Sequence, residues 1–344
     1  MPNLSVQGLQ LSLALLGVLC LLGAIVGGGF KIFGVELPEI KSKPTKVILC
    51  VFGVVLIAVP AIWALWPPRK PIADGNGETT LNFTGANFLA HPAGLAVDNK
   101  GTLYVADHDN NRVLTLAPDS TTPNQIQQFA GTNTLRWPAG VAVDNRGTLY
   151  VADSLNNRVL KLAAGSDTPT EMKEFTGPQY GLDGPLAVAV DNSFNVYVAD
   201  TNHRRVLELA AGSTTPIELA FNSPHLLTPA GVAVDSSLHV YVTDVDAKCV
   251  YKLVPNKVSA QQIPVFSYAG LMGPSGVAVD SHDNVYVTDV TNQVLELAAG
   301  STTATPLAFT STKLAGPTGV AVDSSFNVYV ANWGNGLVLK LPRK

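Results

Sequence analysis

Six histidines are the side chains of this chain best suited to holding a metal ion, because neutral imidazole is a common zinc ligand. They are His91, His108, His203, His225, His239 and His282. The first four lie in segments predicted to be loops on one side of the fold and could form a composite site. His239 and His282 lie in turns predicted on the other side. No HExxH motif or other zinc-ligand spacing is present, so we predict no metal and no cofactor.

Aspartates recur at two positions. The first set lies where hairpin turns are expected, and Asp accepts local backbone hydrogen bonds there: Asp98, Asp144, Asp191, Asp235, Asp280 and Asp323. The second set comprises Asp107, Asp153, Asp200, Asp244 and Asp289, with Asn332 in the sixth place. Arg112, Arg158 and Arg205 follow its first three members by five residues, which predicts pairs that fix loops. A ring of these carboxylates could instead bind a cation, but no calcium-loop spacing supports that reading.

These residues recur because most of the chain consists of six variants of one pattern. The pattern is Pro-x-Gly-[Val/Leu]-Ala-Val-Asp, then Tyr-Val-[Ala/Thr]-Asp, then Arg-Val-Leu-x-Leu. The aspartates that end the first segment are 46, 47, 44, 45 and 43 residues apart. A period in the mid-forties, with four short strands in each unit, predicts the blades of a β-propeller.

The second unit illustrates the expected blade, with strands at 140–143, 148–152, 158–162 and 170–175. Three columns of residues should serve packing. Small residues should let the first strands crowd a central channel: Ala96, Ala142, Ala189, Ala233, Ala278 and Ala321. Rings should pack between blades: Tyr104, Tyr150, Tyr197, Tyr241, Tyr286 and Tyr329. The fourth strands should be marked by Phe129, Phe175, Phe221, Phe266 and Phe309.

The sixth unit has no fourth strand of its own, since the sequence ends soon after its third. An extra strand is predicted before the first blade, at residues 80–84, and it contains Phe83. We therefore predict an all-β fold of six blades in which this N-terminal strand completes the last blade and removes an open edge.

The repeats resemble NHL repeats. The resemblance rests on segments such as Pro138-Ala-Gly-Val-Ala-Val-Asp-Asn-Arg-Gly-Thr-Leu-Tyr-Val-Ala-Asp153 and Asn156-Asn-Arg-Val-Leu-Lys-Leu-Ala-Ala-Gly165, and it spans about residues 79–344. It weakens in the last three blades, where Cys249, Gln293 and Leu337 stand near the place of the third-strand Arg. The repeats look closest to the extracytoplasmic sensor propellers of mycobacterial transmembrane Ser/Thr kinases, which implies a sensor or binding role. The kinase signatures themselves are absent.

The resemblance also implies an alternative. Enzymatic NHL propellers such as the peptidyl-amidating lyases hold zinc with histidines from several blades, and the streptogramin lyases use a related propeller. Here the six histidines do not share one column, and the chain has neither a G-x-S-x-G elbow nor a P-loop. A metal-dependent lyase or hydrolase therefore remains the alternative to a non-enzymatic binding protein, and a structural envelope scaffold is a third reading.

Candidate binding residues are those that depart from the repeat and fall in loops between the fourth and first or the second and third strands. Strands alternate in direction, so these loops should share one face of the ring. The aromatic candidates are Trp137, Tyr180, Tyr268 and Trp333, and His91, Arg136, His225 and Met272 accompany them. Aromatic and Arg side chains are frequent anchors of protein interfaces.

The first 66 residues differ sharply in composition and predict a transmembrane hairpin. Residues 9–30 and 47–66 are uncharged runs, and a 22-residue helix is about 33 Å long, which is enough to span a bilayer. The intervening loop, 31–46, contains four Lys and is expected to be cytoplasmic. Residues 28–40 resemble part of a bacterial two-helix anchor module. Residues 67–78 read as a linker, so the propeller at 79–344 should be extracytoplasmic.

The net charge of the propeller narrows the classes of partner that it could bind. Residues 71–344 hold 16 basic and 24 acidic side chains, so the propeller carries about −8 and is a poor partner for nucleic acid. Cys249 is its single cysteine, which excludes a disulfide within it. The sequence thus predicts a membrane-anchored propeller that captures a protein, peptide or cell-wall glycan through its loop face, without catalysis.

Overall fold

The computed structural model describes residues 31–32, 35–36, 77–129, 134–221, 225–255, 260–263, 266, 270–309 and 314–343. The chain divides into two compact units, Met1–Pro67 and Pro68–Lys344. In the first unit the described residues form β1 (Lys31–Ile32) and β2 (Val35–Glu36), which pair antiparallel. The predicted spans at 9–30 and 47–66 lie outside the described residues. Among those described, no helix is long and apolar enough to cross a membrane.

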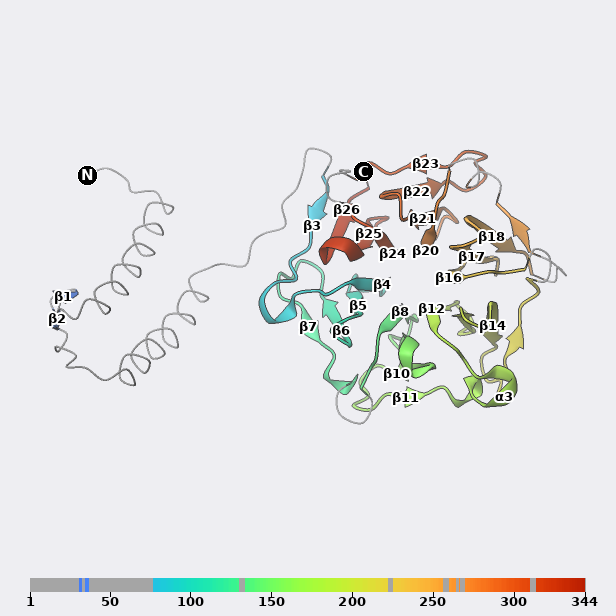
Figure 1. The fold of residues 1–344 in the computed structure, drawn as a ribbon, viewed down its shortest axis with the longest axis horizontal. Coiled ribbons are helices and arrows are strands. Elements are labelled where there is room, and N and C mark those ends of the chain that lie inside the picture. Colours follow the sequence, from blue (N-terminus) through green and yellow to red (C-terminus); the bar gives the residue numbers. More distant parts are fainter. Residues whose placement is uncertain are drawn as a thin grey trace. The chain divides into compact units, whose positions relative to one another are not determined.

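The second unit forms six four-stranded antiparallel sheets that surround a common centre (Figure 1), which confirms the predicted six-bladed propeller. The first strands are β4 (Pro92–Val97), β8 (Pro138–Val143), β12 (Pro185–Val190), β16 (Pro229–Val234), β20 (Pro274–Val279) and β24 (Pro317–Val322). The second strands are β5 (Leu103–Asp107), β9 (Leu149–Asp153), β13 (Val196–Asp200), β17 (Val240–Asp244), β21 (Val285–Asp289) and β25 (Val328–Asn332). The third strands are β6 (Arg112–Leu116), β10 (Arg158–Leu162), β14 (Arg205–Leu209), β18 (Cys249–Leu253), β22 (Gln293–Leu297) and β26 (Leu337–Leu341).

The fourth strands are shorter than predicted, at two residues each. They are β7 (Asn124–Gln125), β11 (Thr170–Glu171), β15 (Ile217–Glu218), β19 (Gln261–Gln262), β23 (Thr305–Pro306) and β3 (Thr79–Thr80). The phenylalanines predicted to lie in these strands come after them instead. Phe129 and Phe175, for example, end the short helices η2 (Gln127–Phe129) and η5 (Lys173–Phe175), and both rings are buried. In each of these blades the strand pairing ends before the Phe is reached.

The ring closes as predicted, through the N-terminal strand. Thr80 pairs with Leu339 and Thr79 with Lys340, so β3 is the fourth strand of the sixth blade. The prediction that this strand contains Phe83 was wrong, because pairing stops at Leu81, whose N–H donates to the Val338 carbonyl at 2.9 Å. The Phe83 ring is nevertheless buried between the first and sixth blades.

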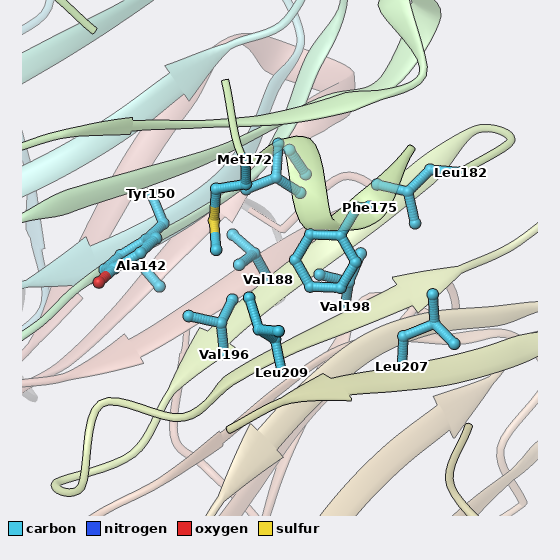
Figure 2. Close-up of a cluster of buried hydrophobic side chains, with 12 residues drawn as sticks. Ala142, Tyr150, Met172, Phe175, Leu182, Val188, Val196, Val198, Leu207 and Leu209 are labelled. Carbon is cyan, nitrogen blue, oxygen red and sulfur yellow. The ribbon is translucent and has the colours of Figure 1, made fainter. Parts of the chain in front are cut away.

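The hydrophobic core is divided among the spaces between blades. Figure 2 shows the cluster between the second and third blades, where Tyr150 and Phe175 pack against Val188 and Leu207. Comparable clusters occupy the other five interfaces, and each contains one ring of the tyrosine column. The prediction that these rings pack between blades is confirmed, since a large ring fills the gap between twisted sheets.

Glycine, rather than the predicted alanine column, lets the first strands approach one another. A Cβ added to Gly94 would lie 2.4 Å from the Ala139 carbonyl oxygen, and one added to Gly276 would lie 2.2 Å from that of Thr318. The alanine column, represented by Ala96 and Ala142, instead packs into the clusters between blades. Its methyl groups point sideways because successive side chains of a strand alternate between its two faces.

The aspartates at the hairpin turns make local hydrogen bonds, as predicted. In the second blade, Asp144 Oδ1 accepts from the backbone N–H groups of Arg146 and Thr148 at 3.0 and 2.8 Å. Its Oδ2 accepts from the Tyr150 hydroxyl at 3.4 Å. The same Asp–Tyr bond joins the two columns in the other blades. Burial and the nearby carboxylate together raise the pKa of Tyr150 to about 12.

Candidate functional site

The loops that were predicted to share a face are joined directly to one another. In the first blade the N–H of Asp109, after the second strand, donates to the carbonyl of Ala90, before the first strand, at 3.1 Å. Equivalent bonds join Leu155 to Arg136 and Gly334 to Ala315, at 3.1 and 2.8 Å. We call this side of the ring the loop face.

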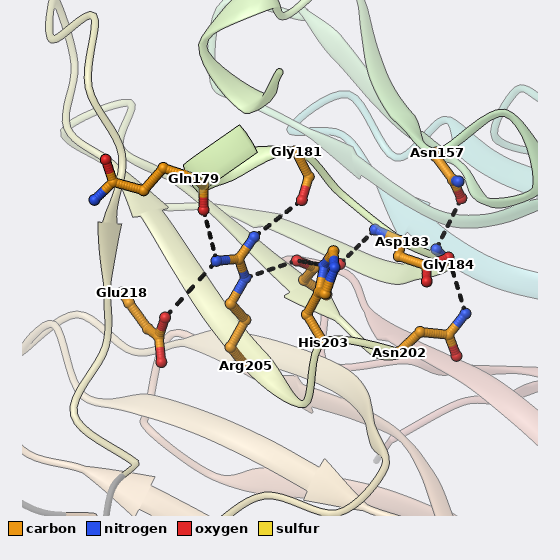
Figure 3. Close-up of polar contacts among 10 residues, drawn as sticks. Asn157, Gln179, Gly181, Asp183, Gly184, Asn202, His203, Arg205 and Glu218 are labelled. Atoms are coloured by element: carbon orange, nitrogen blue, oxygen red, sulfur yellow. Dashed lines mark hydrogen bonds and ion pairs between the residues drawn. The ribbon is translucent and has the colours of Figure 1, made fainter. Parts of the chain in front are cut away.

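The aspartates that end the second strands hold these loops in place. Asp200 is fully buried, and its carboxylate accepts from the backbone N–H of Asp183 at 2.7 Å and from Arg205 Nε at 2.8 Å. Figure 3 shows the Arg205 guanidinium also donating to the carbonyls of Gln179 and Gly181, at 2.8 and 2.9 Å. Asp107–Arg112 and Asp153–Arg158 make the same ion pair at 2.7 Å.

The later blades replace the Arg with other donors. Asp289 accepts from the backbone N–H groups of both Met272 and Gly273 at 3.0 Å, and from the Thr291 hydroxyl. Every member of this aspartate column is fully buried and engaged in such bonds. None of them is among the described residues that line the cavity at the centre of the ring. The structure therefore accounts for these carboxylates by loop fixation, and the alternative of a cation ring has no geometry to support it.

A cavity of about 450 Å³ lies at the centre of the ring. Its wall is built from the residues that follow Pro in the first strands, such as Ala93, Gly94 and Leu95 of β4. The other first strands contribute their equivalents, among them Ala139, Leu186, Ala230, Ser275 and Thr318. His108, Val290 and Trp333 line it from loops of the loop face, so these residues mark its mouth. Among the described lining residues His108 is the one titratable side chain, and the wall is otherwise apolar or hydroxylic.

Four rings and one carboxylate gather at this mouth. His91 stacks on Trp333 with ring centroids 4.8 Å apart, and His108 meets the edge of Trp333 at 4.8 Å and stacks on Trp137 at 5.3 Å. Asp109 bridges the two histidines, at 2.5 Å from His91 Nδ1 and 2.6 Å from His108 Nδ1. We call these five residues the mouth cluster. It spans the sixth, first and second blades.

The charge state of the mouth cluster follows from these bonds. The hydrogen bond from His91 is the main reason that the pKa of Asp109 lies below its usual range, and His108 acts in the same direction. Asp109 is therefore an acceptor at neutral pH, and Nδ1 of both rings carries the proton that it accepts. The lone pair of each neutral histidine is then on Nε2.

The backbone of the mouth cluster is held in a conformation that side chains seldom adopt. His91 and Trp137 have φ of 55° and 53°, in the left-handed region, at the position where other blades have Gly184 and Gly316. Asn111 Oδ1 accepts from the Trp137 N–H at 2.8 Å and stabilises that conformation. A left-handed non-glycine residue costs roughly 1–2 kcal/mol, and such residues concentrate at functional sites.

The structure brings some of the predicted residues together and separates others. Trp137, Trp333 and His91 belong to the mouth cluster, and the Trp137 side chain is 48% exposed. Tyr180, in α3 (Gly177–Tyr180), is partly buried against the cluster between the second and third blades instead. Tyr268 lies outside the described residues.

The remaining candidates lie on the loop face or within the turns. Arg136, His225 and Met272 are exposed on the loop face and do not belong to the mouth cluster. His203 pairs with Asp200 at 2.9 Å, and His239 pairs with Asp235 at 2.7 Å in a hairpin turn. Within the described part of the chain, no three His, Cys, Asp or Glu side chains are placed to hold one metal ion.

Sequence reasoning missed two features of this face. Asp109 was not singled out, although it departs from its column, where Leu155, Asn202 and Gly334 stand in other blades. The second feature is exposed apolar side chains in the same loops: Phe88, Leu155, Leu227 and Val290, besides Trp137 and Met272. Their positions outside the repeat columns were the available signal.

Comparison with known proteins identifies the repeat and the fold. Four segments, 89–116, 135–162, 226–252 and 271–293, match the NHL repeat model. No curated protein matches the chain. A catalytically inactive virginiamycin B lyase from Staphylococcus aureus, solved with quinupristin, has 13% identity and a TM-score of 0.55 and covers 77% of this chain and 88% of its own.

Two further solved structures widen the range of functions associated with the fold. A gluconolactonase from Xanthomonas campestris has 14% identity and a TM-score of 0.63, over 81% of this chain and 99% of its own. A chain from a nidogen–laminin complex has 21% identity and a TM-score of 0.55, over 70% of this chain and 84% of its own. Identities this low show a shared fold and leave the function to the site.

Proposed function

We propose that this NHL-repeat propeller is a binding protein that captures a protein, peptide or cell-wall ligand through its loop face, without catalysis. The observation that carries the proposal is the mouth cluster, where Trp137 is half-exposed in a left-handed backbone conformation beside an apolar cavity. Exposed aromatic rings next to a concave apolar surface are typical of ligand sites. One structural neighbour comes from a protein–protein complex of nidogen and laminin.

The chemistry of the channel also favours binding. Its described wall offers the hydroxyls of Ser275 and Thr318, and both already donate to backbone carbonyls of neighbouring strands. The buried aspartates nearest the mouth are committed to loop backbones and arginines. A hydrolytic or elimination site needs an acid or base facing the cavity, and His108 is the one titratable side chain in its described lining.

A lyase or hydrolase is the second candidate, and one observation favours it. Asp109 orients His91 and His108 so that Nε2 of each is the free basic atom, and an imidazole held in this way can act as a general base. Two structural neighbours are a virginiamycin B lyase and a gluconolactonase. Stoichiometric metal in the purified chain, lost when His91, His108, His203 and His225 are all changed to Asn, would favour this candidate.

Binding is tested by changing Trp137 and Trp333 to Ala in the full-length chain and measuring the capture of partners from envelope extracts. Because Trp137 is half-exposed and Trp333 is partly exposed, we expect little change in the melting temperature and loss of capture. Ile217→Ala is the matched control, since Ile217 is 56% exposed on an outer strand away from the loop face. Unchanged capture by the double variant would refute the proposal. A large stability loss would assign the rings to the core.

We also propose that residues 9–30 and 47–66 anchor the chain in a membrane, with the Lys-rich loop inside and the propeller outside. The proposal rests on the two uncharged runs and on the Lys content of residues 31–46. Alkaline phosphatase fused after Lys344 should be active, and the same enzyme inserted between residues 36 and 45 should be inactive. The reverse pattern would place the propeller in the cytoplasm and refute this part of the proposal.

A further inference from the structure

The mouth cluster has the composition of a site for an organic cation. Its carboxylate, Asp109, is 42% exposed and accepts from His91 and His108, whose rings stack on Trp333 and Trp137. An ammonium group is attracted both to a carboxylate and to the face of an aromatic ring, and Trp gives the strongest such attraction among the side chains. Asp109, whose pKa is lowered mainly by the hydrogen bond from His91, supplies the negative charge of the cluster.

The cavity beneath the mouth cluster is suited to an apolar group. Its volume of about 450 Å³ is within the usual range of small-molecule sites. Methyl, methylene and glycine Cα groups form most of its wall, while the Ser275 and Thr318 hydroxyls are already bonded to the protein. A glycan would leave most of its hydroxyls without partners in this cavity, and an unpaired buried polar group is costly.

We propose that the ligand is an alkyl or arylalkyl ammonium compound whose apolar group enters the central cavity and whose ammonium lies at Asp109 in the mouth cluster. The inference rests on the proposed binding function and gives its ligand class. The propeller's net charge of about −8 favours a cationic ligand over an anionic one. Arg136 is the nearest basic residue in sequence to the cluster, and its exposed guanidinium is screened by solvent.

Three probes with the same chain and different head groups test the charge: hexylamine, hexanol and hexanoate. Binding to the full-length chain is measured by ligand-observed NMR at about pH 8, where free imidazole is neutral. We expect hexylamine to bind about fivefold or more tightly than hexanol, and hexanoate to bind most weakly. In Asp109→Asn, hexylamine and hexanol should bind about equally. A preference for hexanoate, or an unchanged preference for hexylamine in Asp109→Asn, would overturn the inference.

The channel offers a matched variant for the apolar group. Leu186 stands in the third blade where other blades have Ala93 and Ala230, so Leu is compatible with the scaffold at this position. The double change Ala93→Leu and Ala230→Leu should fill the channel and weaken hexylamine binding about tenfold, whereas Ile217→Ala should have no effect. Unchanged hexylamine binding in the filled channel would show that the alkyl chain lies elsewhere and would refute the proposed pose.

A second pair of probes distinguishes the source of the ammonium. Phenylalaninamide carries a free amine like a peptide N-terminus, and N-acetylphenylalaninamide has none. Preferential binding of the first would identify peptide termini as ligands, while binding of hexylamine without phenylalaninamide would identify simple alkylamines. If none of these probes binds, the ligand class is wrong. The proposed function fails separately, when the tryptophan double variant still captures its envelope partner.

Discussion

Phe83 should be the residue on which the closure of the ring depends most. It follows the two-residue strand β3, and its side chain is 7% exposed in the interface between the first and sixth blades. Phe83→Ala removes the ring and leaves a cavity beside Leu89 and Leu103. Loss of the Phe83 ring should therefore weaken both the hydrophobic cluster between these two blades and the attachment of β3 to β26.

The expected cost is about 3 kcal/mol. Phe→Ala changes in cores cost roughly 3–5 kcal/mol, and the lower end applies here because the short strand beside Phe83 can relax into the cavity. For a domain of more than about 250 residues, 1 kcal/mol corresponds to about 2 °C, so the melting temperature should fall by about 6 °C. Urea unfolding of the full-length chain, followed by circular dichroism, measures the free energy directly.

Two matched variants make the result interpretable. Phe88 lies five residues further on and is 54% exposed, so Phe88→Ala should cost less than about 0.5 kcal/mol. Phe309 of the fifth blade is 8% exposed, and Phe309→Ala should cost about as much as Phe83→Ala. If Phe83→Ala melts within about 1 °C of the unmodified chain while Phe309→Ala is strongly destabilised, then the N-terminal strand does not hold the ring closed.

Three further predictions concern ionisable groups. Asp153→Ala removes the buried partner of Arg158 and of the Arg136 N–H, so it should cost about 3–5 kcal/mol in urea unfolding; a loss below about 1 kcal/mol would show that the pair does not hold the loop. The pKa of Tyr104 and of Tyr150 is raised to about 12, mainly by burial, so tyrosinate absorbance should show both rings still protonated well above pH 10, the usual value. Since a raised folded pKa favours the neutral ring, their contribution to stability is complete below about pH 10 and is lost as pH rises towards 12. The pKa of Asp109 is lowered, so the stabilisation that its ionised carboxylate gives the mouth cluster is complete above the usual Asp range and is lost as pH falls through the lowered pKa. Tryptophan fluorescence should report this acid transition, and Asp109→Asn should abolish it.

The ring itself was predictable because each blade repeats the same local rules. Six copies of the repeat share the alternation of apolar residues, the turn aspartates and the spacing of those aspartates. A strand or turn that is ambiguous in one copy can therefore be predicted from the others. The need to remove an open edge predicted that the N-terminal strand would complete the sixth blade, and β3 pairs with β26 accordingly. The loop-fixing partners of Arg112, Arg158 and Arg205 were also visible as a constant spacing of five residues.

What the repeat could not determine was which non-repeating loop residues meet. Trp333 lies in the last blade and His91 and His108 in the first, more than 200 residues apart in sequence, and ring closure is what brings them into contact. Tyr180 satisfied the same sequence criterion as Trp137, yet it packs against the core, because the short helix α3 places its ring beside the second and third blades. The local sequence pattern determines the strands through backbone geometry and burial. The mouth cluster depends instead on the direction in which single loop side chains leave the scaffold. Tertiary contacts decide that direction, and the hydrogen bond from the Trp137 N–H to Asn111 is one of them.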